Sequence, residues 1–537
     1  MRRGPVPSSA PRPRRRPLRR ALVALLLVAG AGAADGTEAQ DRFREAYRDD
    51  APLAQRRAAI LELARADVPE AADLLFSTWE RLEEETLGLR KDLHEVRRKA
   101  RAMRIRVRSE PAKVDPEALR ALETRETDLD ARLGELELER AAILQGVASL
   151  KAGATLGWLA EHGLSRARSP ALLRGSAERV MAWPEGGVAA VLDALEKTRD
   201  AGQAVALLDA LASRGDKVGA PGLPTILKRL SDRDGAVRAA AAQATARAAL
   251  PEGVAALVRQ VQRESDRSRT QREMFDALRI LTGANPGDDP KIWQKWWRDH
   301  EAEVMAGKTA LGAGKPAPVT SDQGNFYGIP QLEDRIIYVL DRSGSMIMSM
   351  ENPRFVNGGP VAARDDEDSR FDAATRELLR AAKSLRRDAR YTVVAYSDHA
   401  EAILGDTLEP AKPERHAALA AALAQMGAEG QTNIYEALDL ALRLAGVHPE
   451  EPPGPARADA IYLLTDGAPT DARGQTEDPE RTLEAAREWN ALRRVAIHTI
   501  GIGADHNSAF LRQLAAENGG TYWAVKPRKK EANAPGK

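Results

Sequence analysis

The feature that most constrains the fold is a run of five β-prone apolar residues, 336–340, that ends directly in Asp341. Such an uninterrupted run is typical of a strand buried on both faces of a sheet. Further strands follow it, and segments with helical periodicity lie between them. Strands that alternate with helices predict a doubly wound α/β domain over residues 333–526, with a parallel sheet covered on both faces. The other strands are expected at 391–396, 458–464, 495–502 and 522–525.

The chain before this domain predicts helices and almost no strands. Within residues 41–155, apolar residues recur at heptad spacing over 82–107 and again over 119–150, and Pro111 and Pro116 lie between the two stretches. Heptad spacing is typical of coiled coils, and proline breaks a helix. We therefore expect an antiparallel coiled-coil hairpin. The spacing does not distinguish a free arm from one that packs on the next domain.

Residues 156–306 predict an array of helical repeats. The sequence Asp-Gly-Ala-Val-Arg at 234–238, followed by an alanine-rich helix, resembles a HEAT repeat. In such arrays each helix pair buries its apolar face against its neighbours, and the curved surface often binds protein. Near the end of the array, Trp293, Trp296 and Trp297 share one helix face. Aromatic residues at this spacing favour a packed plug over a ligand platform.

Two segments border the α/β domain. Residues 307–332 are rich in glycine and proline, which predicts a linker with little regular structure. A linker of this kind predicts that residues 333–526 form a separable unit. Residues 527–537 are basic and are expected to be a disordered tail.

The N-terminus predicts export. Residues 1–33 hold eight arginines and no acidic residue, and an apolar run and small residues follow the arginines. This order is typical of a cleaved signal peptide, and the apolar run is shorter than the approximately 20 residues of a membrane span. Loss of the eight arginines changes the formal net charge from +1 to −7, which argues against nucleic-acid binding. The absence of cysteine excludes disulfides, thiolate nucleophiles and cysteine-bound zinc. We expect a periplasmic, cell-surface or secreted protein without a stable membrane span.

Three short polar motifs follow strands or precede helices of the α/β domain. They are Asp341-x-Ser343-x-Ser345, Thr432 within Gly-Gln-Thr-Asn-Ile, and Asp466 within Leu-Thr-Asp-Gly. Together they resemble a von Willebrand factor type A domain with a complete metal-ion-dependent adhesion site, as in exported bacterial proteins of this family. The resemblance covers about residues 333–526. The alternative for the first motif is that it only caps the following turn.

The residue types give a separate reason for a metal site. Carboxylate and hydroxyl oxygens suit a hard divalent cation, Mg²⁺ before Ca²⁺, with Mn²⁺ as a substitute. The resemblance implies that Ser343 and Ser345 bind the ion directly and that Thr432 binds directly or through water. It also implies that Asp341 and Asp466 act largely through water. An open coordination position would then accept a glutamate or aspartate carboxylate from a partner protein.

These observations predict a binding protein and not an enzyme, because the sequence shows no nucleophile–base pair and no H-E-x-x-H metal motif. We expect cation-dependent adhesion or assembly, with further protein contacts on the helical repeats. One alternative is an accessory subunit that recruits clients to an envelope or secreted complex, and another is a cytosolic-type partner of an ATPase. Residues 346–370 form an insertion that is expected to shape partner choice. Its acidic run, 365–368, could form a second cation site, but a solvated charged loop is the favoured interpretation.

Overall fold

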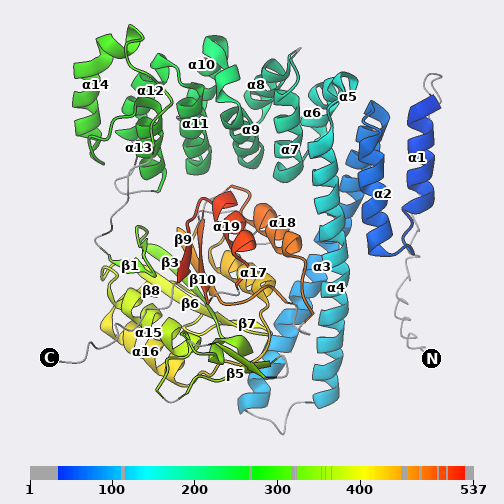
Figure 1. The fold of residues 1–537 in the computed structure, drawn as a ribbon, viewed down its shortest axis with the longest axis vertical. Coiled ribbons are helices and arrows are strands. Elements are labelled where there is room, and N and C mark those ends of the chain that lie inside the picture. Colours follow the sequence, from blue (N-terminus) through cyan, green and yellow to red (C-terminus); the bar gives the residue numbers. More distant parts are fainter. Residues whose placement is uncertain are drawn as a thin grey trace, which may run out of the picture.

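The computed structural model shows an all-helical part and an α/β part that lie against each other (Figure 1). This arrangement confirms the expected fold class. The expected signal peptide and basic tail lie outside the described residues. The structure describes residues 34–109, 115–184, 186–264, 269–315, 321, 323–351, 353–356, 359–364, 366–448, 456–470, 475–492, 495–503 and 506–525.

The first helices include a long antiparallel pair, α3 and α4, which runs beside the α/β part (Figure 1). Asp115 caps α4 by accepting a hydrogen bond from the backbone N–H of Glu117 at 2.9 Å. The heptad residues Leu82, Leu93 and Val96 are buried, as a coiled-coil seam requires. The helices of this region are α1 (Ala34–Ala46), α2 (Leu53–Arg65), α3 (Pro69–Ser109) and α4 (Pro116–Ser149).

The remaining helices stack as an array across one end of the molecule (Figure 1). Helices α7, α9, α11 and α13 pack in succession, and α8, α10 and α12 pack against that layer. One continuous apolar core joins them to the first helices. The array comprises α5 (Gly153–Trp158), η2 (Leu159–Gly163), α6 (Leu164–Arg166), α7 (Pro170–Met181), α8 (Gly187–Lys197), α9 (Ala201–Ser213), η3 (Gly215–Lys217), α10 (Gly219–Arg229), α11 (Gly235–Ala248), α12 (Pro251–Val261), α13 (Arg269–Thr282) and α14 (Pro290–Met305).

The tryptophan cluster on α14 packs within the array. Trp293 is fully buried and its indole N–H donates to the carbonyl oxygen of Gly287 at 2.8 Å. Trp296 and Trp297 are half-buried against the same core. A packed plug therefore describes the cluster.

The α/β part is built on a seven-stranded sheet in the order β11-β10-β9-β3-β6-β7, with β8 also paired to β6. The strands from β11 to β6 are parallel, as the sequence predicts. Strands β7 and β8 are antiparallel to β6 and were not expected, because their two or three residues are too short to show a pattern. The strands are β3 (Arg335–Asp341), β6 (Arg390–Tyr396), β7 (Ala400–Ala402), β8 (Glu409–Pro410), β9 (Ala460–Thr465), β10 (Ala496–Ile502) and β11 (Tyr522–Val525).

Helices cover both faces of the sheet. Alternating strand residues share one apolar core with α17, α18 and α19, and another with α15 and α16. The insertion contributes a 3-10 turn and a short strand pair between β3 and α15. The elements are η4 (Gly344–Ile347), β4 (Arg354–Val356), β5 (Gly359–Val361), α15 (Arg370–Lys383), α16 (Pro413–Ala424), α17 (Ile434–Leu444), α18 (Pro479–Trp489) and α19 (Ser508–Glu517).

The glycine- and proline-rich segment has more structure than its composition predicts. Strands β1 (Asn325–Phe326) and β2 (Ile329–Pro330) form a short antiparallel pair, and Phe326 and Ile329 are buried in the core of the α/β part. At the other end, the backbone N–H of Gly314 donates to the carbonyl oxygen of Ile280 at 3.0 Å. Its ends are therefore packed on the two parts that it joins.

The hairpin is docked on the α/β domain. Leu93 of α3 and Leu133 of α4 belong to the same apolar core as α17 and α18. Next to them, Glu137 accepts from Arg90, Arg481 and Tyr435 in a buried network of charged groups. Two residues of the hairpin therefore contribute to the core of the domain, and the hairpin is docked on it and not a free arm.

The array also contacts the α/β domain, at the end where the parallel strands begin. Arg272 of α13 forms an ion pair with Glu333 at 3.1 Å, two residues before β3. Near the hairpin, Arg57 of α2 lies 3.4 Å from Asp478. Among the described residues, no helix is long and apolar enough to cross a membrane.

Candidate metal centre

The five predicted metal residues lie around the carboxyl ends of β3 and β9. Asp341 is the last residue of β3, and Asp466 follows the last residue of β9 directly. The two strands are parallel neighbours, with Leu340 opposite Leu464. The chain winds away from β3 in both directions, to β6 on one side and to β9 on the other. Such a switch point leaves a crevice outside the strand ends, where α/β proteins bind their ligands.

Asp341 is fully buried and organises the crevice through three hydrogen bonds. Its Oδ1 accepts from the backbone N–H of Ser343 at 2.8 Å. Its Oδ2 accepts from Thr465 Oγ1 at 2.7 Å and from the Tyr396 hydroxyl at 3.2 Å. Burial, together with the negative charge of Asp466, raises the pKa of Asp341 to about 7. A cation bound nearby would lower this pKa and favour the charged carboxylate.

The two serines place their hydroxyl groups side by side. Ser343 Oγ and Ser345 Oγ are 3.1 Å apart, and Ser345 Oγ donates to Asp466 Oδ1 at 2.7 Å. Ser343 is buried, whereas Ser345 is partly exposed. Because the single hydroxyl hydrogen of Ser345 is donated to Asp466, its oxygen can offer a remaining lone pair to a cation.

Thr432 approaches the crevice on the loop before α17. It is buried, and its backbone N–H donates to Thr470 Oγ1 at 2.8 Å. The carbonyl oxygen of Gly430 accepts from the backbone N–H of Gly344 at 2.9 Å, which ties this loop to the serine motif. A Cβ atom added at Gly467 would lie 3.4 Å from Thr432 Oγ1. The Thr432 hydroxyl is therefore close to the residue that follows Asp466.

The donor set of this crevice fits a hard divalent cation. The five side chains offer hydroxyl and carboxylate oxygens, and the hydroxyls of the two serines are adjacent. A turn cap alone would need only Asp341 and Ser343, and would not bring Asp466 to hydrogen-bond distance of Ser345. The structure thus brings all five predicted residues to one edge of the sheet.

Arg370 is a member of the crevice that the sequence did not indicate. Its Nη1 donates to Asp466 Oδ2 at 2.6 Å, and the side chains are 1% and 0% exposed. The residue lies at the start of α15, 25 positions after Ser345, and only the folded insertion brings it back to the site. An arginine at a helix start has no motif around it that could have identified it.

A second group of potential ligands lies where the hairpin meets the domain. One ligand atom each of Glu126, His399 and Glu436 lies within 4.8 Å of the others. Arg97 forms an ion pair with Glu126 at 3.2 Å, and its positive charge lowers the pKa of Glu436. These carboxylates have their countercharge within the protein.

The acidic run of the insertion is partly neutralised by local arginines. Asp368 lies 2.6 Å from Arg376, and Glu367 lies 3.3 Å from Arg354. These pairs agree with a charged surface loop.

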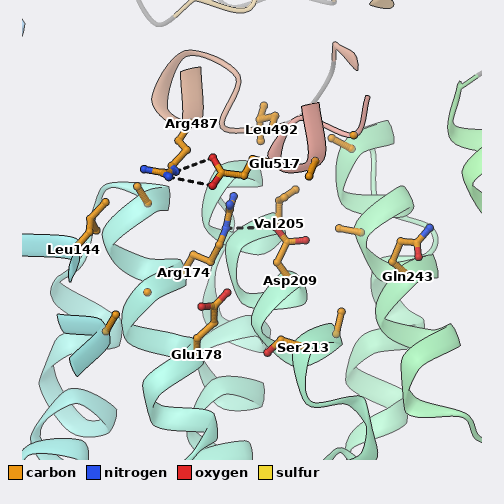
Figure 2. A pocket seen from close by; sticks show the side chains of 18 of the residues that line it. Leu144, Arg174, Glu178, Val205, Asp209, Ser213, Gln243, Arg487, Leu492 and Glu517 are labelled. Carbon is orange, nitrogen blue, oxygen red and sulfur yellow. Dashed lines mark hydrogen bonds and ion pairs between the residues drawn. The ribbon is translucent and has the colours of Figure 1, made fainter. Parts of the chain in front are cut away.

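A cleft of about 1190 Å³ lies between the array and the α/β domain. Figure 2 shows Arg487 and Glu517 on the domain side, facing Arg174 and Asp209 on the array side. Arg487 pairs with Glu517 at 2.9 Å and Arg174 with Asp209 at 3.5 Å, whereas Arg57 and Asp478, which also line the cleft, form an ion pair between the helical part and the domain at 3.4 Å. Alanines of α7, α11 and neighbouring helices also line the cleft, together with polar residues such as Glu178 and Gln243.

Comparison with known proteins identifies the α/β part. Residues 336–532 match the family model of the von Willebrand factor type A domain, which supports a domain of this kind in the α/β part. Over 195 residues, the chain is 27% identical to inter-alpha-trypsin inhibitor heavy chain H3 of Bos taurus and 28% identical to heavy chain H4 of Homo sapiens. Over 137 residues it is 29% identical to the uncharacterized protein sll0103 of a Synechocystis strain.

These matches cover a minor part of each protein. They span 36% of this chain for the two heavy chains and 26% for the Synechocystis protein. They span 19%, 18% and 29% of the H3, H4 and Synechocystis proteins respectively.

Solved structures with a similar domain include a von Willebrand factor type A protein from Catenulispora acidiphila. It is 23% identical, with a TM-score of 0.28, over 36% of this chain and 38% of that one. Proximal thread matrix protein 1 from the mussel byssus is 18% identical, with a TM-score of 0.24, over 36% and 41% of the two chains.

Proposed function

We propose that this protein binds other proteins through a divalent cation held at the carboxyl edge of its von Willebrand factor type A domain. The observation that supports it most is the hydrogen-bonded chain from Ser343 through Ser345 to Asp466, which holds two hydroxyl oxygens 3.1 Å apart beside a carboxylate. Binding of an ion needs such preorganised oxygens, because each must replace a water molecule of the ion.

The residues that would hold the ion divide into two roles. Ser343 and Ser345 offer direct oxygen ligands, and Thr432 binds directly or through water. Asp341 and Asp466 orient these groups and act on the ion largely through water. Mg²⁺ fits this oxygen set, and Mn²⁺ or Ca²⁺ can substitute.

The bound ion would supply a positive charge that attracts an anionic ligand. Neutral hydroxyls leave that charge only partly compensated, so a glutamate or aspartate of a partner completes the coordination. The rim of the crevice is open for such a side chain, since Gly430 and Gln431 are exposed and Ser345 is partly exposed. This chemistry describes binding, and we propose no catalytic step.

The biological setting that we propose is outside the cytoplasm, in adhesion or in assembly of an extracytoplasmic complex. The arginine-rich and apolar N-terminal segment supports export. The cleft between the array and the domain is a second surface where a client protein would contact both parts (Figure 2).

The test is metal binding by the full chain, measured by calorimetry with Mg²⁺ and Mn²⁺. Asp341→Asn removes the charge but keeps the shape, and is expected to weaken binding at least tenfold while the circular dichroism spectrum stays unchanged. Thr432→Ala should weaken binding with little effect on stability. Asp368→Ala, which removes an exposed carboxylate of the neighbouring acidic run, serves as the matched control and should bind like the wild type. Equal affinity in the wild type and Asp341→Asn would refute the proposed site.

A further inference from the structure

A buried arginine neutralises one of the two carboxylates of the candidate metal centre. Arg370 and Asp466 form an ion pair at 2.6 Å, and both side chains are excluded from solvent. Removal of a charged arginine from water is costly unless its partner is well placed. Here the partner is a residue that the metal centre also needs.

The insertion positions Arg370 at the crevice. Ser369 caps α15, with its hydroxyl accepting from the backbone N–H of Asp372 at 3.0 Å, and Arg370 is the first residue of that helix. The backbone N–H of Arg370 donates to the carbonyl oxygen of Met348 at 2.8 Å. The insertion therefore leaves the serine motif and returns to it, and its last residue reaches into the site.

The ion pair occupies the part of Asp466 that would otherwise serve a cation. Asp466 Oδ1 accepts from Ser345, and its Oδ2 accepts from Arg370. With both aspartates ionised, the site carries two negative charges from Asp341 and Asp466 and one positive charge from Arg370. A divalent cation would thus leave the centre with an excess of positive charge, and a ligand carboxylate would remove it.

We propose that Arg370 makes cation binding depend on an anionic ligand, so that the metal and a partner carboxylate bind together more tightly than either binds alone. The inference rests on the proposed function and adds a residue that sets the ligand preference of the same site. Arg370 and a cation at the serine hydroxyls would lie on either side of the same Asp466 carboxylate. Repulsion between two positive charges in such buried surroundings is strong enough to weaken cation binding by about tenfold or more.

The experiment compares the full-chain wild type with Arg370→Gln and Arg370→Met, which remove the charge and retain an unbranched side chain. Mn²⁺ binding is measured by proton relaxation enhancement, in sodium chloride and in sodium acetate of equal ionic strength. The control is Arg376→Gln, because Arg376 lies on the same helix and is 62% exposed in its pair with Asp368. A second readout is the rise in urea midpoint on addition of Mn²⁺, which needs no partner.

In chloride, the Arg370 variants should bind Mn²⁺ about tenfold or more tightly than the wild type and the control. Acetate should tighten Mn²⁺ binding in the wild type and have less effect in the variants. Mn²⁺ should also stabilise the variants more, because it would compensate the negative charge of Asp466 that Arg370 balances in the wild type.

Each other outcome has a defined meaning. Equal Mn²⁺ affinity in the wild type and in a folded Arg370 variant overturns the inference and leaves the proposed function intact. Binding only in the variants, with none by the wild type even in acetate, would show that Arg370 excludes the ion, and would overturn both the inference and the proposed function. Absence of binding in all four proteins overturns both.

Discussion

Glu137 is the point at which the hairpin, α17 and α18 are joined, and its replacement should loosen the docked arm. The side chain is fully buried, and accepts from Arg90 Nη2 at 2.8 Å, Tyr435 OH at 2.6 Å and Arg481 Nε at 2.9 Å. The Glu137→Gln variant keeps the shape of the side chain, but its amide N–H₂ group would face Arg90, Tyr435 or Arg481, which are themselves donors. We therefore expect loss of stability without loss of the fold.

The size of the effect follows from these three contacts. Loss of one partner of a buried ion pair typically costs about 3–5 kcal/mol. The two arginines retain other partners, since Arg90 also pairs with Glu488 at 2.6 Å and Arg481 with Glu477 at 2.8 Å. The lower end, about 3 kcal/mol, is therefore expected. If the free energy of unfolding falls by about 2–3 kcal/mol per molar urea, this loss should lower the urea midpoint by about 1 M.

The assay is urea unfolding followed by tryptophan fluorescence. Trp489 reports on this interface, because its ring lies 5.0 Å from that of Tyr435. Glu84→Gln is the control, since Glu84 is an exposed residue of the same hairpin and its replacement should change stability by less than about 0.5 kcal/mol. Equal midpoints for the two variants would show that the buried network does not stabilise the docked arm.

Two further predictions concern other contacts between the parts. Burial, together with the positive charges of Arg269 and Arg272, lowers the pKa of His498 to about 3. Between about pH 3 and pH 6.5, His498 is therefore protonated in the unfolded chain but not in the folded chain. The free energy of unfolding should therefore fall as the pH decreases below about 6.5, and His498→Gln should reduce this loss, measured by urea unfolding at pH 7 and pH 5. Cleavage at a protease site placed within 316–320 should leave both halves associated in gel filtration, because the hairpin shares the core of the domain; separate elution would contradict the docked arrangement.

The fold was largely predictable because its local patterns agree with its tertiary structure. The apolar run at 336–340 is a central strand, and strands in a parallel sheet must be apolar on both faces. The heptads predicted the hairpin, but not its docking. Docking depends on residues such as Glu137 and Arg140, which occupy the buried side of α4 although they are charged. A charged residue in a heptad looks like a solvent-facing position until its partners are known, and two of these partners, Arg481 and Glu488, are more than 300 residues away in sequence.

The candidate site shows the same contrast. Asp341, Ser343 and Ser345 are close in sequence, and each later motif follows a strand or precedes a helix, so the sheet topology alone brings them together. Arg370 could not be predicted in this way, because its place depends on the path of the insertion. Arg370 and Asp466 are 96 residues apart, and no motif spacing links the start of a helix to an aspartate at that distance.

The arrangement of the two parts also determines how a partner would reach the metal centre. Arg272 of the array contacts Glu333 just before β3, whereas Asp341 ends that strand. Since strand residues advance by about 3.3 Å each, these two ends lie roughly 20 Å apart. The array therefore covers the edge where the strands begin and leaves the opposite edge accessible. The hairpin, however, binds Tyr435, which is only one helical turn beyond Thr432. The loop that carries Thr432 therefore leads directly into a helix held by the hairpin, so we expect the position of Thr432 to depend on the helical part and not on the domain alone.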